Sequence, residues 1–286
     1  MTPFTDILPG LRQQYGDPSP ILILAPTTRC GSTLLQRAIN QAEQAIIYGE
    51  NFIFMEQAPL VLGGQLADIE PKTQAALASL DVFLKGDKGI DASALFPDYG
   101  AYRRLLLSFF YQIADFYQRE STKHGHNRWG VKHQITNLAG FHNFVQLVPG
   151  FKSVTVFRDA VDVAKSMQTR WPENLASPAQ CFEIGKQWRE NLRYLLHLDR
   201  SRNLVIRYET LVGSPEELIP KIESHLGVAL SPEAFRKKVN AHTFDPVTGQ
   251  AGETYVPPSE LPRGKLRALL HGAQPLYGRL GYAAPV

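Results

Sequence analysis

The sequence has few cysteines, little net charge and no long apolar run, and each shortage excludes a class of protein. Its two cysteines, Cys30 and Cys181, cannot make a disulfide framework or a zinc site by themselves. This scarcity favours a reducing compartment. The formal net charge is only +3 over 286 residues, so the composition gives no support for a nucleic-acid partner.

No stretch of the sequence approaches eighteen uninterrupted apolar residues, so we expect no membrane span. The first twenty residues carry Asp6, Arg12 and Asp17 and lack the apolar segment of a secretory signal. Hydrophobic residues make up 44% and charged residues 20% of the chain, as in ordinary globular proteins. We therefore expect a cytoplasmic protein.

Short apolar runs alternate with amphipathic segments along most of the chain. The apolar runs are typical of buried parallel strands and cover Ile21–Ala25, Ala45–Tyr48, Trp129–Lys132, Ser153–Phe157 and Leu204–Arg207. Helical patterns cover Ser32–Gln41, Tyr102–Glu120, Asn137–Leu147, Ala160–Thr169, Pro178–Leu198 and Pro215–Leu226. The alternation predicts an α/β fold, with a central parallel β-sheet flanked by helices in a single domain over residues 1–286.

Two segments do not follow this alternation. Residues 60–100 contain several Gly and Pro residues and are expected to form an insertion. Such an insertion could form a lid or part of an acceptor pocket, or be a simple surface elaboration. From Ala241 onward the chain is rich in Gly and Pro, and a final helix is expected at Leu266–Leu270.

The segment after the first apolar run has the composition of a phosphate-binding loop. It reads Thr27-Thr28-Arg29-Cys30-Gly31-Ser32-Thr33 and leads into a helical pattern. The free backbone N–H groups and partial positive charge of a helix N-terminus suit a phosphate. A plain strand-to-helix turn, with Ser32 as the N-cap, explains the loop equally well.

Two common phosphate chemistries do not fit this loop. A nucleoside-triphosphatase loop requires Lys directly before Ser or Thr, and here Gly31 occupies that position. A cysteine phosphatase requires an Arg at a fixed short spacing after its catalytic Cys. The spacing from Cys30 to Arg37 is one residue too long for this motif. The extra residue would turn Arg37 onto another face of the helix.

Three blocks of sequence resemble sulfotransferases that use 3′-phosphoadenosine 5′-phosphosulfate (PAPS). Arg29-Cys30-Gly31-Ser32-Thr33-Leu34 resembles their 5′-phosphosulfate loop, although Cys30 stands where Ser is usual. The segment from Val154 to Ser166 resembles their 3′-phosphate segment, and Val205–Leu211 resembles a late strand ending in Tyr-Glu-Asp-Leu. The closing Leu280-Gly281-Tyr282 recurs in bacterial members.

The resemblance implies a P-loop-like fold and sulfonate transfer from PAPS to a hydroxyl or amine, leaving adenosine 3′,5′-bisphosphate. The acceptor would be a small molecule, a glycan or a lipid, and no metal is expected. Donor-binding positions implied by the motifs are Arg29, Cys30, Gly31, Ser32, Thr33, Leu34, Arg158, Ser166, Tyr208 and Arg263.

The resemblance also implies which group of the donor each of these residues would bind. Arg29 and Thr33 would hold the sulfonate and 5′-phosphate, while Arg158 and Ser166 would converge on the 3′-phosphate, with Arg263 as a further candidate. Tyr208 and Trp171 are adenine candidates, although core packing explains both. We expect Cys30 to replace a serine in an anion cradle, with its thiol pKa lowered by the helix N-terminus and Arg29.

The general base has two candidates. Glu50 follows the second apolar run, where many relatives carry an acid that deprotonates the acceptor; a helix-stabilising Glu is the alternative. His133 ends the third run, and histidine is a common general base in enzymes. Lys132 beside it could steady the sulfonate, but adjacent strand residues point to opposite faces, so Lys132 and His133 compete for the site.

Two functions of other classes stay open at this stage. A P-loop nucleotide kinase or nucleoside triphosphatase would require magnesium, and a non-catalytic nucleotide-binding protein would bind the donor without turnover. The cluster Lys123–Arg128 contains two histidines but lacks nearby acidic or thiol ligands, so we expect a solvated loop there. The sequence predicts neither the oligomeric state nor the acceptor.

Overall fold

The computed structural model of the protein describes residues 8–16, 18–64, 82–86, 99–236 and 257–283. The chain divides into two compact units. The smaller comprises residues 1–19, 51–120 and 137–150, and the larger comprises residues 20–50, 121–136 and 151–286.

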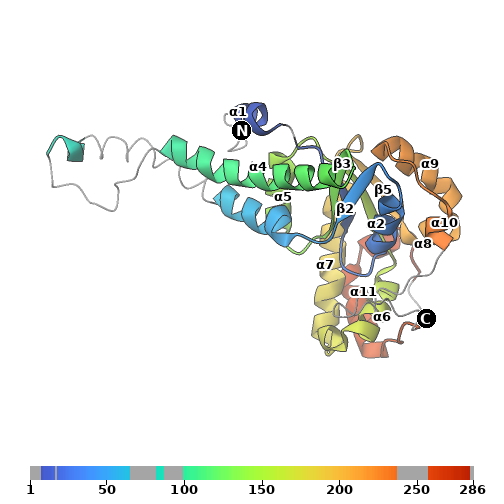
Figure 1. The fold of residues 1–286 in the computed structure, drawn as a ribbon. Helices are drawn as coiled ribbons and strands as arrows, with labels where there is room; N and C mark the ends of the chain where they lie inside the picture. The colour runs from blue at the N-terminus through green and yellow to red at the C-terminus, as the bar shows by residue number, and fades with distance from the viewer. Residues whose placement is uncertain (1–7, 17, 65–81, 87–98, 237–256, 284–286) are drawn as a thin grey trace, which may run out of the picture. The chain divides into compact units, whose positions relative to one another are not determined.

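The larger unit is built on a parallel β-sheet (Figure 1). Its strands are β1 (Ile21–Ala25), β2 (Ala45–Tyr48), β3 (Arg128–Gln134), β4 (Lys152–Phe157) and β5 (Asn203–Arg207), in the order β2-β3-β1-β4-β5. The central strand β1 is buried along its whole length. That burial is why it reads as a continuous apolar run, as strands covered on both faces do.

The helices of the larger unit pack into two apolar clusters. They are α2 (Ser32–Asn40), α6 (Ala160–Arg170), η3 (Pro172–Leu175), α7 (Pro178–Leu196), α8 (Tyr208–Gly213), α9 (Pro215–Leu226), α10 (Glu233–Arg236), α11 (Arg263–Ala273) and α12 (Leu276–Arg279). One cluster joins α2, α9 and α10 to the sheet, and the other joins α6, α7, α11 and α12. Ser177 and Gln180 form a capping box that begins α7.

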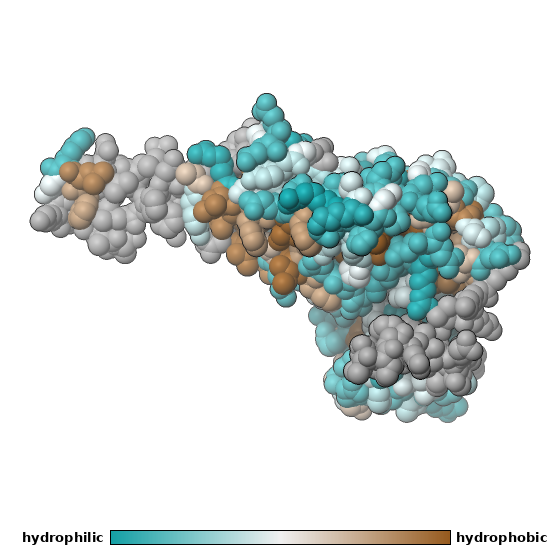
Figure 2. Space-filling view, in the orientation of Figure 1, coloured by the Kyte–Doolittle hydropathy of each residue, from teal (hydrophilic) through white to brown (hydrophobic). Residues whose placement is uncertain are grey.

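The smaller unit contains α1 (Leu8–Tyr15), a π-helical turn η1 (Ile53–Gln57), α5 (Leu138–Leu147) and most of the long helix α4 (Tyr99–Lys123). Its core is aromatic. The Phe54 ring lies 4.9 Å from Phe110 and 5.3 Å from Phe144, centroid to centroid. Large apolar side chains on α4 and η1, among them Leu105 and Phe109, are exposed (Figure 2). None of the described helices is long and apolar enough to cross a membrane.

The structure confirms the α/β fold with its central parallel sheet, and every predicted strand is present. The boundaries differ by a few residues, and the main difference is that β3 continues past Lys132 to Gln134. The helix expected at 266–270 is α11, which is longer, and it is not the last one because α12 follows it. Most of the expected insertion at 60–100, and the tail between 241 and 256, lie outside the described residues. The single-domain organisation stays a prediction.

Candidate functional site

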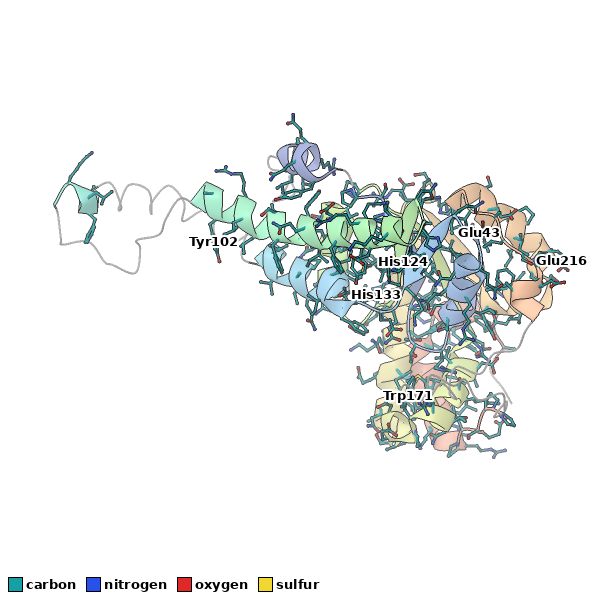
Figure 3. All side chains as sticks on the ribbon, viewed as in Figure 1. Glu43, Tyr102, His124, His133, Trp171 and Glu216 are labelled. Carbon is teal, nitrogen blue, oxygen red and sulfur yellow. The ribbon has the colours of Figure 1, made fainter. Side chains whose placement is uncertain are left out.

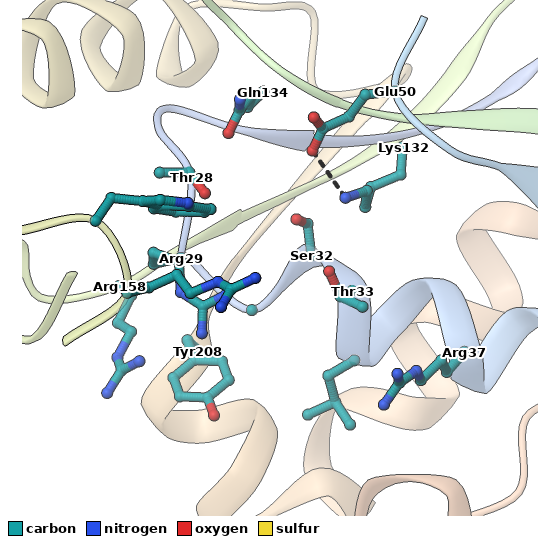
Figure 4. A pocket seen from close by; sticks show the side chains of 14 residues that line it. Thr28, Arg29, Ser32, Thr33, Arg37, Glu50, Lys132, Gln134, Arg158 and Tyr208 are labelled. Atoms are coloured by element: carbon teal, nitrogen blue, oxygen red, sulfur yellow. Dashed lines mark hydrogen bonds and ion pairs between the residues drawn. The ribbon is translucent and has the colours of Figure 1, made fainter. Parts of the chain in front are cut away.

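A polar cavity of about 420 Å³ in the larger unit adjoins the carboxyl ends of β1, β3 and β4 (Figure 4). This edge of an open parallel sheet is where such folds bind ligands. The cavity is lined by Thr28, Arg29, Gly31, Ser32, Thr33, Leu34, Arg37, Glu50, Lys132, Gln134, Arg158, Arg170, Trp171 and Tyr208. It therefore brings together most of the residues predicted from the sequence.

The loop before α2 presents backbone N–H groups to this cavity. Gly31, not Ser32, is the N-cap of α2, and no side chain of the described residues caps the helix. The plain-turn explanation with Ser32 as N-cap is therefore wrong. Gly31 has φ 95°, and a Cβ placed there would lie 2.1 Å from Cδ2 of Tyr208. Only glycine fits between this backbone and the tyrosine ring.

Arg29 connects the loop to α6. Its backbone is in the left-handed region, with φ 68°, and its Nε donates a hydrogen bond to Oγ of Ser166 at 3.0 Å. The guanidinium lies 5.9 Å from the centre of the Trp171 ring. Burial, followed by repulsion from Arg158 and Arg170, lowers the pKa of Arg29. Ser166 is itself buried and contacts Arg29, and it does not line the cavity with Arg158.

Arg158 lies against the aromatic ring of Tyr208. Its guanidinium is 4.7 Å from the centre of the Tyr208 ring, and its Nη2 is 3.6 Å from Oδ2 of Asp162. The ring fixes the guanidinium without neutralising it. Tyr208 and Trp171 both line the cavity (the position of Trp171 is labelled in Figure 3), so neither is only a core residue.

The charges around the cavity are unbalanced. Five cationic side chains line it, from Arg29, Arg37, Lys132, Arg158 and Arg170. Glu50 supplies the one carboxylate among its described lining residues, and its Oε1 lies 2.8 Å from Nζ of Lys132. The side chains of this pair are 30% and 15% exposed, respectively. Such an excess of positive charge around a helix N-terminus suits a ligand with several negative groups.

The strand β3 decides between the adjacent candidates Lys132 and His133. Lys132 and Gln134 line the cavity, whereas His133 between them is fully buried (Figure 3). This follows from the two-residue period of a strand. The structure therefore brings Lys132, and not His133, to Glu50. Gln134 was missed because the predicted strand ended too early, although the same period could have identified it.

Cys30 faces the protein interior. Its side chain is fully buried among residues such as Phe157 and Trp188, and its Sγ lies 3.5 Å from Oγ1 of Thr27. Burial is the main cause that raises the pKa of the thiol. The expectation that the helix N-terminus and Arg29 lower this pKa is wrong, because desolvation of the thiolate outweighs both.

Two arginines of the cavity had no role in the sequence interpretation. Arg37 lies four residues after Thr33 on α2, so the helical period brings both to the cavity. From the sequence, Arg37 was tested only against the geometry of a cysteine phosphatase, which it does not fit. Arg170 ends α6. Arg263, by contrast, is exposed at the start of α11 and is not among the described lining residues.

Comparison with known proteins agrees with this arrangement. Residues 20–232 match the model of a family described as the sulfotransferase family. The chain belongs to the sulfotransferase family. No curated protein matches it.

Solved structures of sulfotransferases resemble this family member over nearly its whole length. A sulfotransferase domain from the curacin biosynthetic pathway is 18% identical, with a TM-score of 0.53, over 94% of this chain and 99% of that one. The sulfotransferase domain of the Synechococcus PCC 7002 olefin synthase is 16% identical, with a TM-score of 0.49, over 94% and 97%. At this identity the first likeness supports the shared P-loop-like α/β fold.

The described part of this sulfotransferase contains no group of three or more His, Cys, Asp or Glu side chains placed to hold a metal ion. The two histidines of the Lys123–Arg128 segment do not form such a group. His126 Nδ1 instead lies 3.0 Å from the carbonyl oxygen of Glu43. The cations of the cavity are thus the positive groups that the described chain itself offers to an anionic ligand.

Proposed function

We propose that this protein transfers a sulfonate group from PAPS to a hydroxyl or amine of a small-molecule, glycan or lipid acceptor. The observation that carries the proposal is the ion pair of Glu50 with Lys132 inside a cavity whose other charged lining residues, among those described, are arginines. Arginines suit a donor that bears several negative groups, and a single carboxylate suits the removal of one proton.

Two groups of residues would bind the two ends of the donor. The amides at the start of α2, with Arg29 and Thr33, would hold the sulfonate and the 5′-phosphate. Arg158 would bind the 3′-phosphate, and the rings of Tyr208 and Trp171 are the aromatic surfaces available to adenine. Gly31 allows the loop backbone to lie close to the Tyr208 ring, which keeps this ring beside the loop amides.

The transfer itself is a displacement at sulfur. The acceptor oxygen or nitrogen forms a bond to sulfur while the bond from sulfur to the 5′-phosphate oxygen breaks. The electron pair of the broken bond stays on that phosphate, which leaves as adenosine 3′,5′-bisphosphate, and the acceptor proton moves to Glu50. Positioned cations lower the barrier by stabilising the charge that develops on the leaving oxygen.

Lys132 and Glu50 would change partners during this reaction. Lys132 Nζ and Glu50 Oε1 are 2.8 Å apart, so the ion pair holds the carboxylate beside the cavity. When the anionic donor binds, Lys132 would turn to the sulfonate or the leaving oxygen and release Glu50 to accept the acceptor proton. His133 is buried away from the described cavity lining, so the geometry supports Glu50 as the base.

Donor binding separates this function from its nucleotide-binding competitors. We expect adenosine 3′,5′-bisphosphate to raise the melting temperature without metal, and ATP with magnesium to have little effect. The Arg158→Ala variant should lose the shift, because it removes the cation assigned to the 3′-phosphate. A shift with ATP and magnesium alone would contradict the proposal and favour a nucleotide kinase.

Turnover separates catalysis from mere binding. In Glu50→Gln, sulfate transfer from radiolabelled PAPS to a panel of alcohols should fall by about a hundredfold or more, with bisphosphate binding retained. Glu43→Gln is the matched control, since Glu43 is exposed and lies outside the described cavity lining (Figure 3). Undiminished transfer in Glu50→Gln would exclude Glu50 as the base. Tight bisphosphate binding without transfer in the unmodified protein would indicate a non-catalytic binding protein.

A further inference from the structure

Next to the cavity is a narrow space that no step of the donor chemistry uses. This slot has a volume of about 120 Å³ and shares Thr28 and Gln134 with the cavity. Its remaining lining residues are Thr27, Ile135, Thr136, Met167, Ile184 and Gln187. The slot thus begins at the wall of the cavity that carries Lys132 and leads away between β3 and helices α6 and α7.

Beyond the slot lies a wider groove along α7. The groove has a volume of about 610 Å³ and shares Met167, Ile184 and Gln187 with the slot. Ala179 and Phe182 add further apolar surface. The cavity, slot and groove therefore adjoin one another in series within the larger unit. Ile135, Met167 and Ile184 give the slot apolar surface beside its threonines and glutamines, and the surface of the groove is mostly apolar. The two spaces therefore suit a slender, largely apolar chain better than a rigid or highly polar molecule.

Gln134 stands where the cavity meets the slot. Its Oε1 is buried and has no hydrogen-bond partner among the described residues. Figure 4 shows this amide oxygen turned toward the cavity. A buried amide oxygen without a donor is unfavourable, so most such atoms in proteins are paired. An unpaired acceptor at the border of a binding cavity is a place for a donor on the ligand.

The chemistry of the acceptor limits which group can fill that place. A reacting hydroxyl has one proton, and under the proposed function that proton goes to Glu50. The same hydroxyl therefore cannot also donate to Gln134 Oε1 during the reaction. The hydrogen bond to Gln134 needs a second O–H or N–H at the reacting end of the acceptor.

We propose that the acceptor has two hydrogen-bond donors at the reacting end of a slender apolar chain. One donor group loses its proton to Glu50 and takes the sulfonate. The other binds Gln134 Oε1, and the apolar chain lies in the slot and the groove along α7. This inference rests on the proposed function and specifies the substrate class of the same site.

Paired alcohols test the role of Gln134. With radiolabelled PAPS as donor, kcat/KM for octane-1,2-diol should exceed that for octan-1-ol by about tenfold, the value of one well-placed hydrogen bond. Octylamine, with two N–H groups after deprotonation, distinguishes an amine from a diol as the source of the second donor. In Gln134→Met, which keeps the length but loses the oxygen, the preference for diol over mono-alcohol should disappear. Gln112→Met, at an exposed position on α4, should retain it.

Chain length tests the slot and groove. We expect kcat/KM for 1,2-diols to rise from four to ten carbons as more apolar surface is buried. Ala179→Trp, which fills the groove from an exposed position, should remove the gain for the longer chains and leave butane-1,2-diol unchanged. Ala176→Trp makes the same change at a nearby exposed position outside the described groove lining and should have no such effect.

The outcomes distinguish this inference from the function on which it rests. If bisphosphate binds and alcohols are sulfated with no preference for a second donor or a longer chain, the inference is wrong and the function stands. Bisphosphate binding with no transfer to any of these alcohols also overturns the inference. Absence of both bisphosphate binding and transfer contradicts the proposed function itself.

Discussion

Arg29 and Ser166 are 137 positions apart in the chain, yet Nε of Arg29 donates to Oγ of Ser166 at 3.0 Å. Ser166 is buried, so water competes little for this bond. The contact fixes the loop before α2 against α6. Positions that the family resemblance assigns to opposite ends of the donor are thus physically coupled before any ligand binds.

Removal of the serine hydroxyl should weaken donor binding without removing any charge. In Ser166→Ala, the Arg29 guanidinium loses its buried acceptor and is less well oriented. We expect the Kd of adenosine 3′,5′-bisphosphate, measured by isothermal titration calorimetry, to rise by about tenfold, the usual effect of one bond to a charged group. Ser108→Ala is the control, since Ser108 is on α4 and its Oγ donates to the Leu105 carbonyl, away from the described cavity lining. An unchanged Kd in Ser166→Ala would show that this bond does not orient Arg29.

Arg29 combines a functional charge with an unfavourable backbone conformation. It is the one non-glycine residue of the described chain with a positive φ, 68°. The left-handed conformation costs a residue with a Cβ about 1 kcal/mol or more, a cost that glycine avoids. Arg29→Gly should therefore be more stable than Arg29→Ala by about 1 kcal/mol in urea unfolding, while both lose bisphosphate affinity equally. Equal stability of the two variants would mean that the loop relaxes when the arginine is removed.

Gly31 is constrained both by its backbone and by Tyr208. A Cβ would meet the tyrosine ring at 2.1 Å, and φ is 95°. Gly31→Ala should lose about 2 kcal/mol of unfolding free energy, within the usual range for overpacking and backbone strain. The double variant Gly31→Ala/Tyr208→Ala relieves the collision but not the backbone strain, so a double-mutant cycle should show a favourable coupling. Zero coupling would mean that the whole loss of unfolding free energy in Gly31→Ala comes from backbone strain.

The sequence predicted the sheet well because buried parallel strands read as continuous apolar runs. The loop before α2, Arg158 and Glu50 were identifiable because motifs fix them relative to the ends of strands. The sequence could not decide between Lys132 and His133, because that choice depends on how far β3 extends and how it pairs with its neighbours. In the structure β3 aligns Lys132 with Ile23 and continues to Gln134, which sets the two-residue alternation at this edge.

Contacts between distant segments were equally inaccessible. The position of Cys30 in the motif suggested a group facing an anion, but the loop geometry turns its side chain into a core formed partly by Trp188 of α7. The pairing of Glu50 with Lys132 spans 82 positions of the chain. Neither local propensity nor periodicity carries information about such pairs, because they arise only when the sheet has assembled.

The buried thiol of Cys30 should therefore be chemically inert in the folded protein. Burial raises its pKa, so the reactive thiolate is scarcer than in an unfolded chain, and the side chain is fully enclosed. Alkylation of Cys30 by iodoacetamide near neutral pH can be followed in a Cys181→Ser background. It should be at least about a hundredfold slower in buffer than in concentrated urea, because the thiol is exposed only when the protein unfolds locally or globally.

The same pKa shift gives the pH dependence of stability a definite sign. The folded state favours the neutral thiol, so this contribution is fully present below the pKa of the unfolded thiol and is lost as pH rises through the higher folded value. Unfolding free energies in urea at increasing alkaline pH should fall more steeply for the unmodified protein than for Cys30→Ser, which has no thiol to ionise. Rapid alkylation of the folded protein, prevented by adenosine 3′,5′-bisphosphate, would instead place the thiol in the anion site. It would contradict both the buried position and the raised pKa.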